Sequence, residues 1–286
     1  MRWPPPAQWP HAARSQQVLC KPHRWHVQTL GQGADVLVLH GAGSSTHSFR
    51  ALMPLLAETY RVIALDLPGQ GFTQLGARHR CGLEETAVDI AALCQAQGWQ
   101  PKAIIGHSAG GALALRLSQL LSLRGQHLKV VGINPALDNF EGLAGVLFPA
   151  LAKMLSALPF TAQVFASVSG KPERVKALIR TTGSDIDAEG LELYGALMRD
   201  RDHADATLLM MAQWSIEAFL PKIDSVTAPT LFITGENDGS VPPAVSDRAA
   251  ARMPNARVTH LSDLGHLAHE EAPEQIAGLI SNFLAD

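Results

Sequence analysis

The sequence predicts an α/β fold in which a mostly parallel central sheet is flanked by helices and carries a helical cap. Short apolar runs rich in valine, isoleucine and leucine alternate with longer helix-forming runs. This alternation is typical of parallel strands joined by crossover helices. The strand runs are apolar along their whole length, which indicates burial on both faces of the sheet. The strand pattern stops near residue 138 and resumes near residue 226, so the intervening stretch is expected to form the cap.

Length and composition exclude several classes of protein. The 286 residues are 47% hydrophobic and 17% charged, which suits a chain with a sizeable core and argues against disorder. A net charge of −3 gives no reason to expect nucleic-acid binding. The three cysteines form no CxxC pair and are expected to be free thiols. Without a transmembrane-length apolar run or a secretory signal, the expected location is the cytoplasm.

Residues 1–24 are rich in proline and are expected to form an irregular arm, in which Trp3 and Trp9 can pack on the body of the protein. Residues 25–137 then form the first part of the core. Its expected strands are Trp25–Leu30 at the sheet edge, Asp35–Leu39, Arg61–Leu65, Ala103–Ile105 and Lys129–Ile133. Its expected helices are Phe49–Thr59, Glu84–Gln97 and Ala109–Leu115.

Residues 138–225 are expected to form the cap, and residues 226–286 complete the core. The expected cap helices lie around Leu143–Leu155, Pro172–Thr181, Ala188–Arg199 and Ala204–Phe219. The core resumes with strands Pro229–Thr234 and Arg257–Leu261 and ends with a helix over Pro273–Leu284. Phenylalanine and methionine are frequent in the cap, which suits a large apolar or planar substrate, although helix packing alone also requires such residues.

The central motif is Gly106-His107-Ser108-Ala109-Gly110, which stands between an apolar strand and an apolar helix. It fits the Gly-x-Ser-x-Gly nucleophile elbow, in which a serine occupies a strained strand-to-helix turn. Side chains two positions away on either side would collide in so tight a turn, and glycines avoid the collision. The pattern therefore predicts that Ser108 is a nucleophile at the start of a helix.

An earlier strand runs into His40-Gly41-Ala42-Gly43. In isolation this is a plain glycine turn, but its place after a strand favours an oxyanion hole. The backbone N–H groups of Ala42 and Ala109 would then hold the negative charge that develops on a substrate oxygen.

An acid and a histidine follow the last two strands, in the chain order serine, acid, histidine. Asp238 is the preferred acid, since Glu236 lies two positions nearer the strand and Asp263 is expected at a surface turn. His266 would take the Ser108 proton and return it to the leaving group. Further residues near these motifs are possible substrate contacts: His40, Gly41, His107, Trp214 and His269.

These motifs together resemble the α/β-hydrolase superfamily over nearly the whole chain. The stretch Gly265–Pro273 is similar to the Gly-His-x4-Glu-x-Pro tail common there. The resemblance is closer to the BchO-type magnesium-chelatase accessory proteins of bacteriochlorophyll gene clusters. The stretches that carry it are Trp9–His11, Arg24–Gln28, His40–Ser48, Thr182–Ser184, Met210–Trp214 and Gly265–Glu271.

Two positions depart from the pattern that the resemblance implies. Gln70 stands where the superfamily often has histidine in Asp-x-Pro-Gly-His-Gly, and this change is expected to affect a turn rather than Ser108, Asp238 or His266. Asn134-Pro135 stands where Asn-Gly is expected, at a strand end beside the cap.

The resemblance implies a role in bacteriochlorophyll or photosynthetic pigment metabolism in a phototrophic bacterium, without supplying a reaction. One hypothesis is a serine hydrolase acting on an ester or similar carbonyl, with a tetrapyrrole or isoprenoid ester as a suitable apolar substrate. A second is a non-catalytic accessory protein that binds a tetrapyrrole or assists magnesium chelatase. A third is a C–C bond hydrolase or lyase with the same three residues. The complete set of site residues favours an enzyme, because a pure binding protein needs none of them.

No cofactor or metal site is expected. The twelve histidines show no HExxH or HxxEH pattern, and His260 and His266 are six positions apart. The chain also has no GxxxxGK[ST] loop for nucleotide binding, so it is not expected to carry out metal chelation itself.

Overall fold

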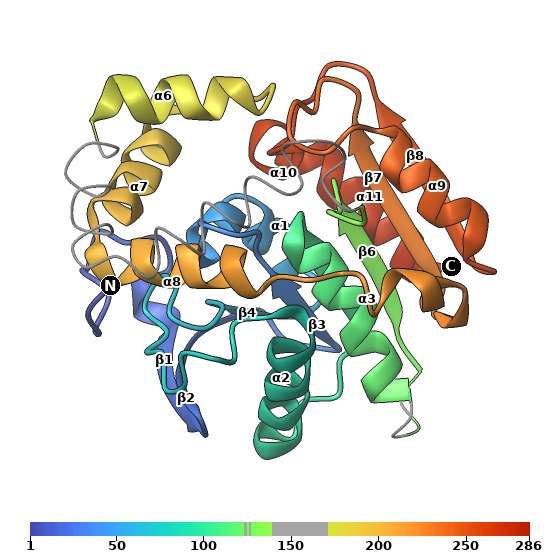
Figure 1. Ribbon diagram of the computed structural model, residues 1–286, viewed down its shortest axis with the longest axis horizontal. Helices are drawn as coiled ribbons and strands as arrows, with labels where there is room; N and C mark the ends of the chain where they lie inside the picture. The colour runs from blue at the N-terminus through green and yellow to red at the C-terminus, as the bar shows by residue number, and fades with distance from the viewer. Residues whose placement is uncertain (123–124, 126, 139–170) are drawn as a thin grey trace.

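The computed structural model describes residues 1–122, 125, 127–138 and 171–286. In this part of the chain, eight strands form one sheet in the order β1-β2-β4-β3-β5-β6-β7-β8 (Figure 1). The pairs from β4 to β8 are parallel, while β2 pairs antiparallel with both β1 and β4. The strands are β1 Ser15–Cys20, β2 His23–Leu30, β3 Asp35–Leu39, β4 Arg61–Leu65, β5 Ala103–His107, β6 Lys129–Ile133, β7 Thr230–Gly235 and β8 Ala256–Leu261. The predicted α/β fold with a mostly parallel sheet is therefore confirmed.

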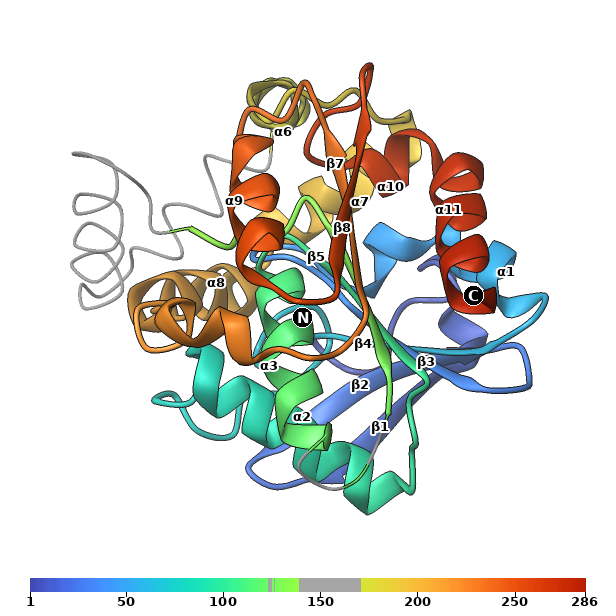
Figure 2. The same ribbon diagram turned by 90° about the vertical axis from the view of Figure 1, so that its right-hand side faces the viewer.

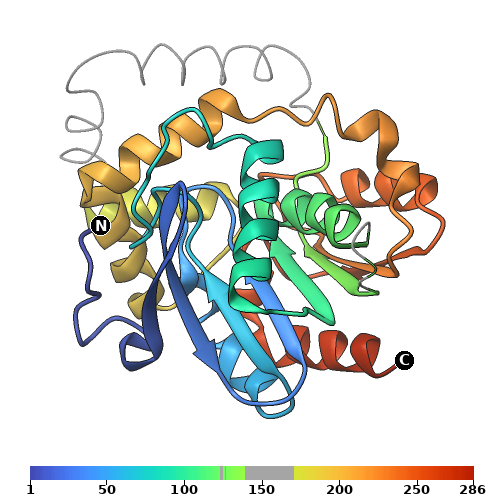
Figure 3. The ribbon, with the colours of Figure 1, turned by 90° about the horizontal axis from the view of Figure 1, so that it is seen from below.

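The N-terminal arm differs from the expectation of an irregular segment. Residues 15–20 form β1, which pairs with β2 from Ser15 opposite Gln28 to Cys20 opposite His23. The strand at 23–30 is consequently not the sheet edge, and β1, at the dark blue end of the colour scale, takes that place (Figure 3). The sequence of β1 mixes polar and apolar residues and does not indicate a strand. An exposed edge strand does not need a continuous apolar run.

Helices cover both faces of the sheet (Figure 2). Each face has its own apolar core. On one face lie α2 (Leu83–Gln97), α3 (Ala109–Ser122) and α9 (Ala244–Arg252). On the other lie α1 (Leu52–Ala57) and α11 (Pro273–Ala285), which contact each other. The short helices are α10 (Ala268–Glu271) and the 3-10 turns η1 (Ala12–Arg14), η2 (Thr46–Phe49) and η3 (Leu220–Ser225). The expected helix over residues 49–59 is divided between η2 and α1, and α9 and α10 were not expected.

Three helices of the predicted cap are described: α6 (Pro172–Thr181), α7 (Ala188–Arg199) and α8 (Arg201–Gln213). They gather on one side of the sheet in Figure 1. The helix expected over 204–219 begins earlier, because the Asp200 carboxylate caps it by accepting the His203 N–H, and it ends at Gln213. The expected helix at 143–155 lies outside the described residues.

Trp9 of the arm packs between the core and the cap, in agreement with the expectation that it packs on the body of the protein. Trp9 is 4% exposed, and its ring packs edge-on against Phe72 of the core with a centroid separation of 5.1 Å. Leu193 and Leu197 of α7 complete this apolar cluster. Within the described residues, no helix has the length and apolar character required to cross a bilayer.

Candidate active site

The elbow has the predicted strand-turn-helix geometry. β5 ends at His107, α3 begins at Ala109, and Ser108 between them has a φ of 52°, in the left-handed region that non-glycine residues seldom occupy. A Cβ at Gly106 would lie 2.0 Å from the Gly110 carbonyl oxygen, and one at Gly110 would lie 2.2 Å from the Leu39 carbonyl oxygen. Both glycines are therefore required by close backbone approach, as the motif predicts. Ser108 itself keeps partial exposure.

The loop after β3 is oriented by His40. The His40 Nδ1–H donates to the Gly41 carbonyl at 2.7 Å, and its Nε2 accepts the Leu67 N–H at 2.9 Å. In a trans peptide the C=O and the following N–H point in opposite directions. Holding the Gly41 carbonyl thus aims the Ala42 N–H away from His40. Within the described part of the chain, neither this N–H nor that of Ala109 has a hydrogen-bond partner. Both donors are therefore free to bind an oxyanion.

The next residue of this loop, Gly43, is held on both sides. Its N–H donates to Gln70 Oε1 at 2.8 Å, and its carbonyl accepts from His203 Nε2 of α8 at 3.2 Å. Gln70 is fully buried, and its amide also reaches Met210 Sδ at 2.9 Å. Gln70 therefore acts beyond its own turn, although neither of these side-chain bonds goes to Ser108, Asp238 or His266. It connects the candidate oxyanion loop to the cap helix α8.

The candidate acid and the candidate base are in direct contact. Asp238 Oδ2 lies 2.7 Å from His266 Nδ1. The other carboxylate oxygen, Oδ1, accepts the N–H groups of Ser240 and Val241 at 2.7 and 2.8 Å, which sets the carboxylate plane. The Asp238 side chain is inaccessible to solvent, while His266 retains 10% exposure. The alternatives Glu236 and Asp263 are exposed and do not bond His266.

The structure brings His266 next to the elbow. The ring of His107 lies 4.7 Å from the ring of His266 between centroids, and His107 Nε2 donates to the His266 carbonyl at 2.9 Å. Ser108 and His266 are not joined by a hydrogen bond in this structure. Such bonds are often long without substrate and tighten in the complex, so the arrangement remains compatible with proton transfer.

Asn134 is a site residue whose position the sequence marked but whose function it did not predict. It lies at the end of β6 with a φ of 44°, and its side-chain amide donates to the carbonyls of Gly265 and His266 at 2.9 and 2.8 Å. Its Oδ1 accepts the Gly235 N–H at 2.8 Å. One buried amide therefore fastens the loop of the candidate base to the end of β7.

The three histidines predicted as possible substrate contacts are buried. His40 and His269 are fully buried and His107 is 3% exposed. Burial lowers the pKa of all three, and for His269 burial and the neighbouring His266 and Arg50 lower it to about 3. These rings are therefore neutral near pH 7. This placement favours a supporting function over contact with a substrate.

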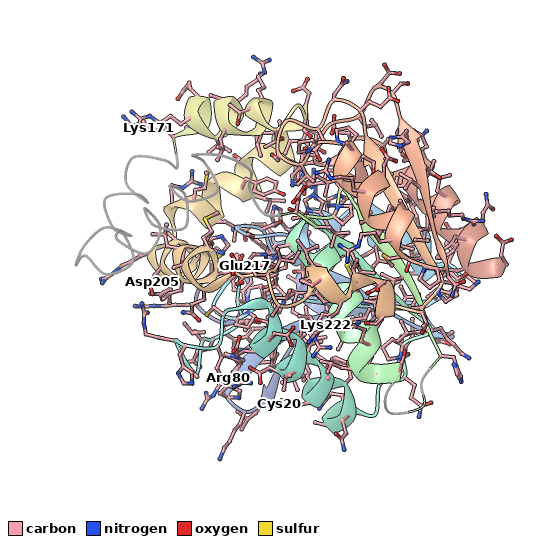
Figure 4. All side chains as sticks on the ribbon, turned by 45° about the vertical axis from the view of Figure 1, so that its right-hand side comes forward. Cys20, Arg80, Lys171, Asp205, Glu217 and Lys222 are labelled. Carbon is pink, nitrogen blue, oxygen red and sulfur yellow. The ribbon has the colours of Figure 1, made fainter. Side chains whose placement is uncertain are left out.

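Gly41 is buried in the same loop, whereas Trp214 is only partly buried and packs against the core at the end of α8. A separate surface cleft lies between α3 and η3 and contains none of the predicted site residues. It is lined in part by Arg116, Phe219 and Lys222, and Lys222 is labelled in Figure 4. Among the described residues, no group of three or more histidine, cysteine, aspartate or glutamate side chains could hold a metal ion.

Comparison with known proteins identifies the class of protein. The family model of the alpha/beta hydrolase fold matches residues 36–273, so the chain belongs to this family. It is 43% identical over 281 residues to the magnesium-chelatase 30 kDa subunit of Rhodobacter capsulatus, covering 98% of this chain and 97% of that protein. This relative confirms the resemblance to the BchO-type proteins.

Two further comparisons agree with the fold. The chain is 26% identical to a pimeloyl-[acyl-carrier protein] methyl ester esterase of Aeromonas hydrophila, over 90% of this chain and 98% of that protein. It superimposes on an alpha/beta hydrolase fold protein from Burkholderia ambifaria with a TM-score of 0.76 at 24% identity, over 93% of this chain and 97% of that one. The last likeness establishes the fold alone.

Proposed function

We propose that this protein is a serine hydrolase acting on an ester or a related carbonyl compound. His266, oriented by Asp238, takes the proton of the Ser108 hydroxyl while Ser108 Oγ attacks the carbonyl carbon. The N–H groups of Ala42 and Ala109 stabilise the oxyanion. His266 then gives the proton to the leaving alcohol. Water attacks the acyl-enzyme with His266 again as base, which releases the acid and restores Ser108.

The observation that carries this proposal is the 2.7 Å contact between Asp238 Oδ2 and His266 Nδ1. The elbow binds the same histidine, since His107, the residue before Ser108, donates to the His266 carbonyl. A carboxylate accepts at the contact with Asp238, so in the proposed mechanism the imidazole proton is on Nδ1 and Nε2 is the base. The free N–H groups of the oxyanion loop and the elbow support it, because a protein that only binds has no need of them.

The 43% identical relative favours a link to bacteriochlorophyll biosynthesis. An apolar substrate such as a tetrapyrrole or isoprenoid ester agrees with this link. The esterase relative from Aeromonas supports ester hydrolysis as the reaction class, since it resembles this chain over nearly its whole length.

The Rhodobacter capsulatus relative also favours a second candidate function. Its name describes a subunit of magnesium chelatase, so an accessory role in which this chain associates with that enzyme or holds its tetrapyrrole is the alternative. A fold that hosts many functions permits this. In that case Ser108 needs no activation.

Labelling with a fluorophosphonate probe separates the two functions. The wild-type protein, Ser108→Ala and the matched control Ser262→Ala, which removes an exposed serine hydroxyl, are each incubated with the probe. We expect labelling of the wild type and of Ser262→Ala, and none of Ser108→Ala. Equal labelling of all three, or of none while all are folded, would contradict the hydrolase proposal and favour the accessory function.

A further inference from the structure

The segment Thr182-Gly183-Ser184 follows α6 and lies against the loops that carry Asp238 and His266. We propose that this cap segment is a positioning element of the active site. It holds two loops in position relative to each other: the acid loop (residues 236–243), which carries Asp238, and the base loop (residues 262–267), which carries His266. The inference rests on the proposed function, since it concerns the geometry of the same site. In the sequence, these three residues carry a family resemblance and no other functional signal.

The segment binds the backbone of the base loop twice. The Thr182 carbonyl accepts the His266 N–H at 3.1 Å, and Ser184 Oγ accepts the Leu267 N–H at 2.8 Å. The Ser184 side chain is 2% exposed, so water cannot readily replace it as an acceptor. Both bonds act on the peptide groups that flank the His266 imidazole.

The same segment also binds the acid loop. The Thr182 carbonyl that holds His266 accepts the Gly239 N–H at 3.0 Å, directly after Asp238. One carbonyl oxygen therefore connects the two loops whose side chains form the 2.7 Å contact between Asp238 and His266. A displacement of Thr182 would act on both partners of that contact at once.

The backbone of the cap segment is in close contact with the backbones of both loops. Gly183 has a φ of 79°, and a Cβ there would lie 1.7 Å from the Asn237 carbonyl oxygen. A Cβ at Gly265 would lie 2.3 Å from the Gly183 carbonyl carbon. The cap segment thus touches the acid loop on one side and the base loop on the other through main-chain atoms.

The remaining polar groups of the base loop are held from within the core. The Gly265 N–H donates to Glu271 Oε1 at 3.0 Å, while Asn134 and His107 bind the carbonyls of Gly265 and His266 as described above. Core residues thus hold the carbonyls, and the cap segment holds the next two N–H groups. His266 therefore requires both parts of the fold, and this end of the cap cannot move away while the base keeps its orientation.

The test compares Ser184→Ala with Thr181→Ala. Both variants remove one hydroxyl, but Thr181 is exposed and its hydroxyl bonds only to the Leu178 carbonyl inside α6. Hydrogen–deuterium exchange is measured on peptides that cover residues 264–268. We expect about tenfold faster exchange in this loop for Ser184→Ala, because the Leu267 N–H loses its acceptor, and no change for Thr181→Ala.

Hydrolysis of p-nitrophenyl butyrate gives the catalytic readout. We expect Ser184→Ala to lower kcat about tenfold with KM within about twofold of the wild type, because the base loosens while substrate contacts are retained. Unchanged loop exchange in Ser184→Ala, or faster exchange with unchanged kcat, would overturn the inference.

The exchange and labelling measurements keep the two proposals distinguishable. If the wild type neither hydrolyses the ester nor reacts with fluorophosphonate, the proposed function fails, and the positioning of His266 for catalysis fails with it. If the wild type is active and Ser184→Ala matches it in both measurements, only the positioning inference fails. Gly183→Ala, which forces the segment off the acid loop, is a second variant and is expected to lose more activity than Ser184→Ala if it folds.

Discussion

At the scale of single residues, Asn134 shows how one buried side chain can organise a site without taking part in the chemistry. Its amide satisfies two carbonyls of the base loop and one N–H at the end of β7. Asparagine suits the position in two ways. It tolerates a positive φ better than most residues, and it offers a donor and an acceptor on one planar group.

Replacing Asn134 by alanine or aspartate separates these contributions. Alanine leaves the Gly265 carbonyl and the Gly235 N–H without a partner, each worth about 1–3 kcal/mol of stability, while the His266 carbonyl keeps its bond from His107. Aspartate keeps an acceptor for the Gly235 N–H but sets a carboxylate against the carbonyls of Gly265 and His266. We expect both variants to lower the Tm and to reduce kcat at least about tenfold, with aspartate the more harmful to kcat. Thermal unfolding and ester hydrolysis check this, and a wild-type kcat for Asn134→Asp would contradict it.

Gln70 is a second buried side chain that holds a loop of the candidate site. A turn residue in the sequence becomes, in the structure, the acceptor for the Gly43 N–H. A histidine at this position would have to reach the same N–H with a ring nitrogen, so the difference from the superfamily pattern concerns the candidate oxyanion loop as well as the turn.

At the scale of elements, α7 is docked on the core through a buried polar network. Tyr194 of α7 donates its hydroxyl to Glu270 Oε1 at 2.8 Å, and Ser48 donates to the same oxygen at 2.7 Å. Arg50 binds the other carboxylate oxygen. Burial raises the pKa of Glu270 despite Arg50, and burial together with Glu270 raises that of Tyr194, so the phenol stays protonated as a donor.

Tyr194→Phe tests how strongly this network holds the cap helix. Removal of the hydroxyl takes away a charge-assisted hydrogen bond, and we expect a loss of about 1–3 kcal/mol in the free energy of unfolding. Amide exchange in α7 should also become faster. Tyr60→Phe, at the other tyrosine of the chain, is the matched control and should change neither quantity. Denaturant unfolding with equal losses in the two variants would count against the network.

At the scale of the whole molecule, buried neutral histidines make stability depend on pH. Burial lowers the pKa of His203 from 6.5 to about 4, and that of His269 from 6.5 to about 3. As the pH falls from 6.5 towards 4, the unfolded chain takes up protons that the folded chain cannot. The stability that these residues contribute is therefore present above pH 6.5 and is lost progressively below it.

Unfolding by denaturant at several pH values between 4 and 6.5 measures this dependence. We expect the free energy of unfolding to decrease as the pH falls. In His203→Gln the slope should be flatter by up to about 1.4 kcal/mol per pH unit, because one proton fewer is taken up on unfolding. The control His79→Gln alters an exposed histidine and should keep the wild-type slope. Identical slopes for wild type and His203→Gln would refute the explanation.

Local patterns predict most of the fold and the central residues of the candidate site. Apolar runs and glycine turns predict the strands from β2 to β8, and the elbow, Asp238 and His266 follow from motifs at strand ends. Parallel strands bring their carboxyl ends to one edge of the sheet, so such motifs can be expected to meet there. The edge strand β1 escaped prediction, because its residues are only partly buried and carry no continuous apolar signal.

The tertiary structure alone decided what holds the site in place. Asn134 is 131 positions from Gly265, and Ser184 is 83 from Leu267, yet each pair is hydrogen-bonded. Such partners are backbone groups, which every residue carries, so neither residue type nor spacing reveals them. Candidate catalytic residues can be predicted from the chain, because few types of side chain are able to carry out such chemistry. The residues that position the site cannot be predicted in this way. They depend on which peptide groups folding brings within about 3 Å of a buried amide or hydroxyl.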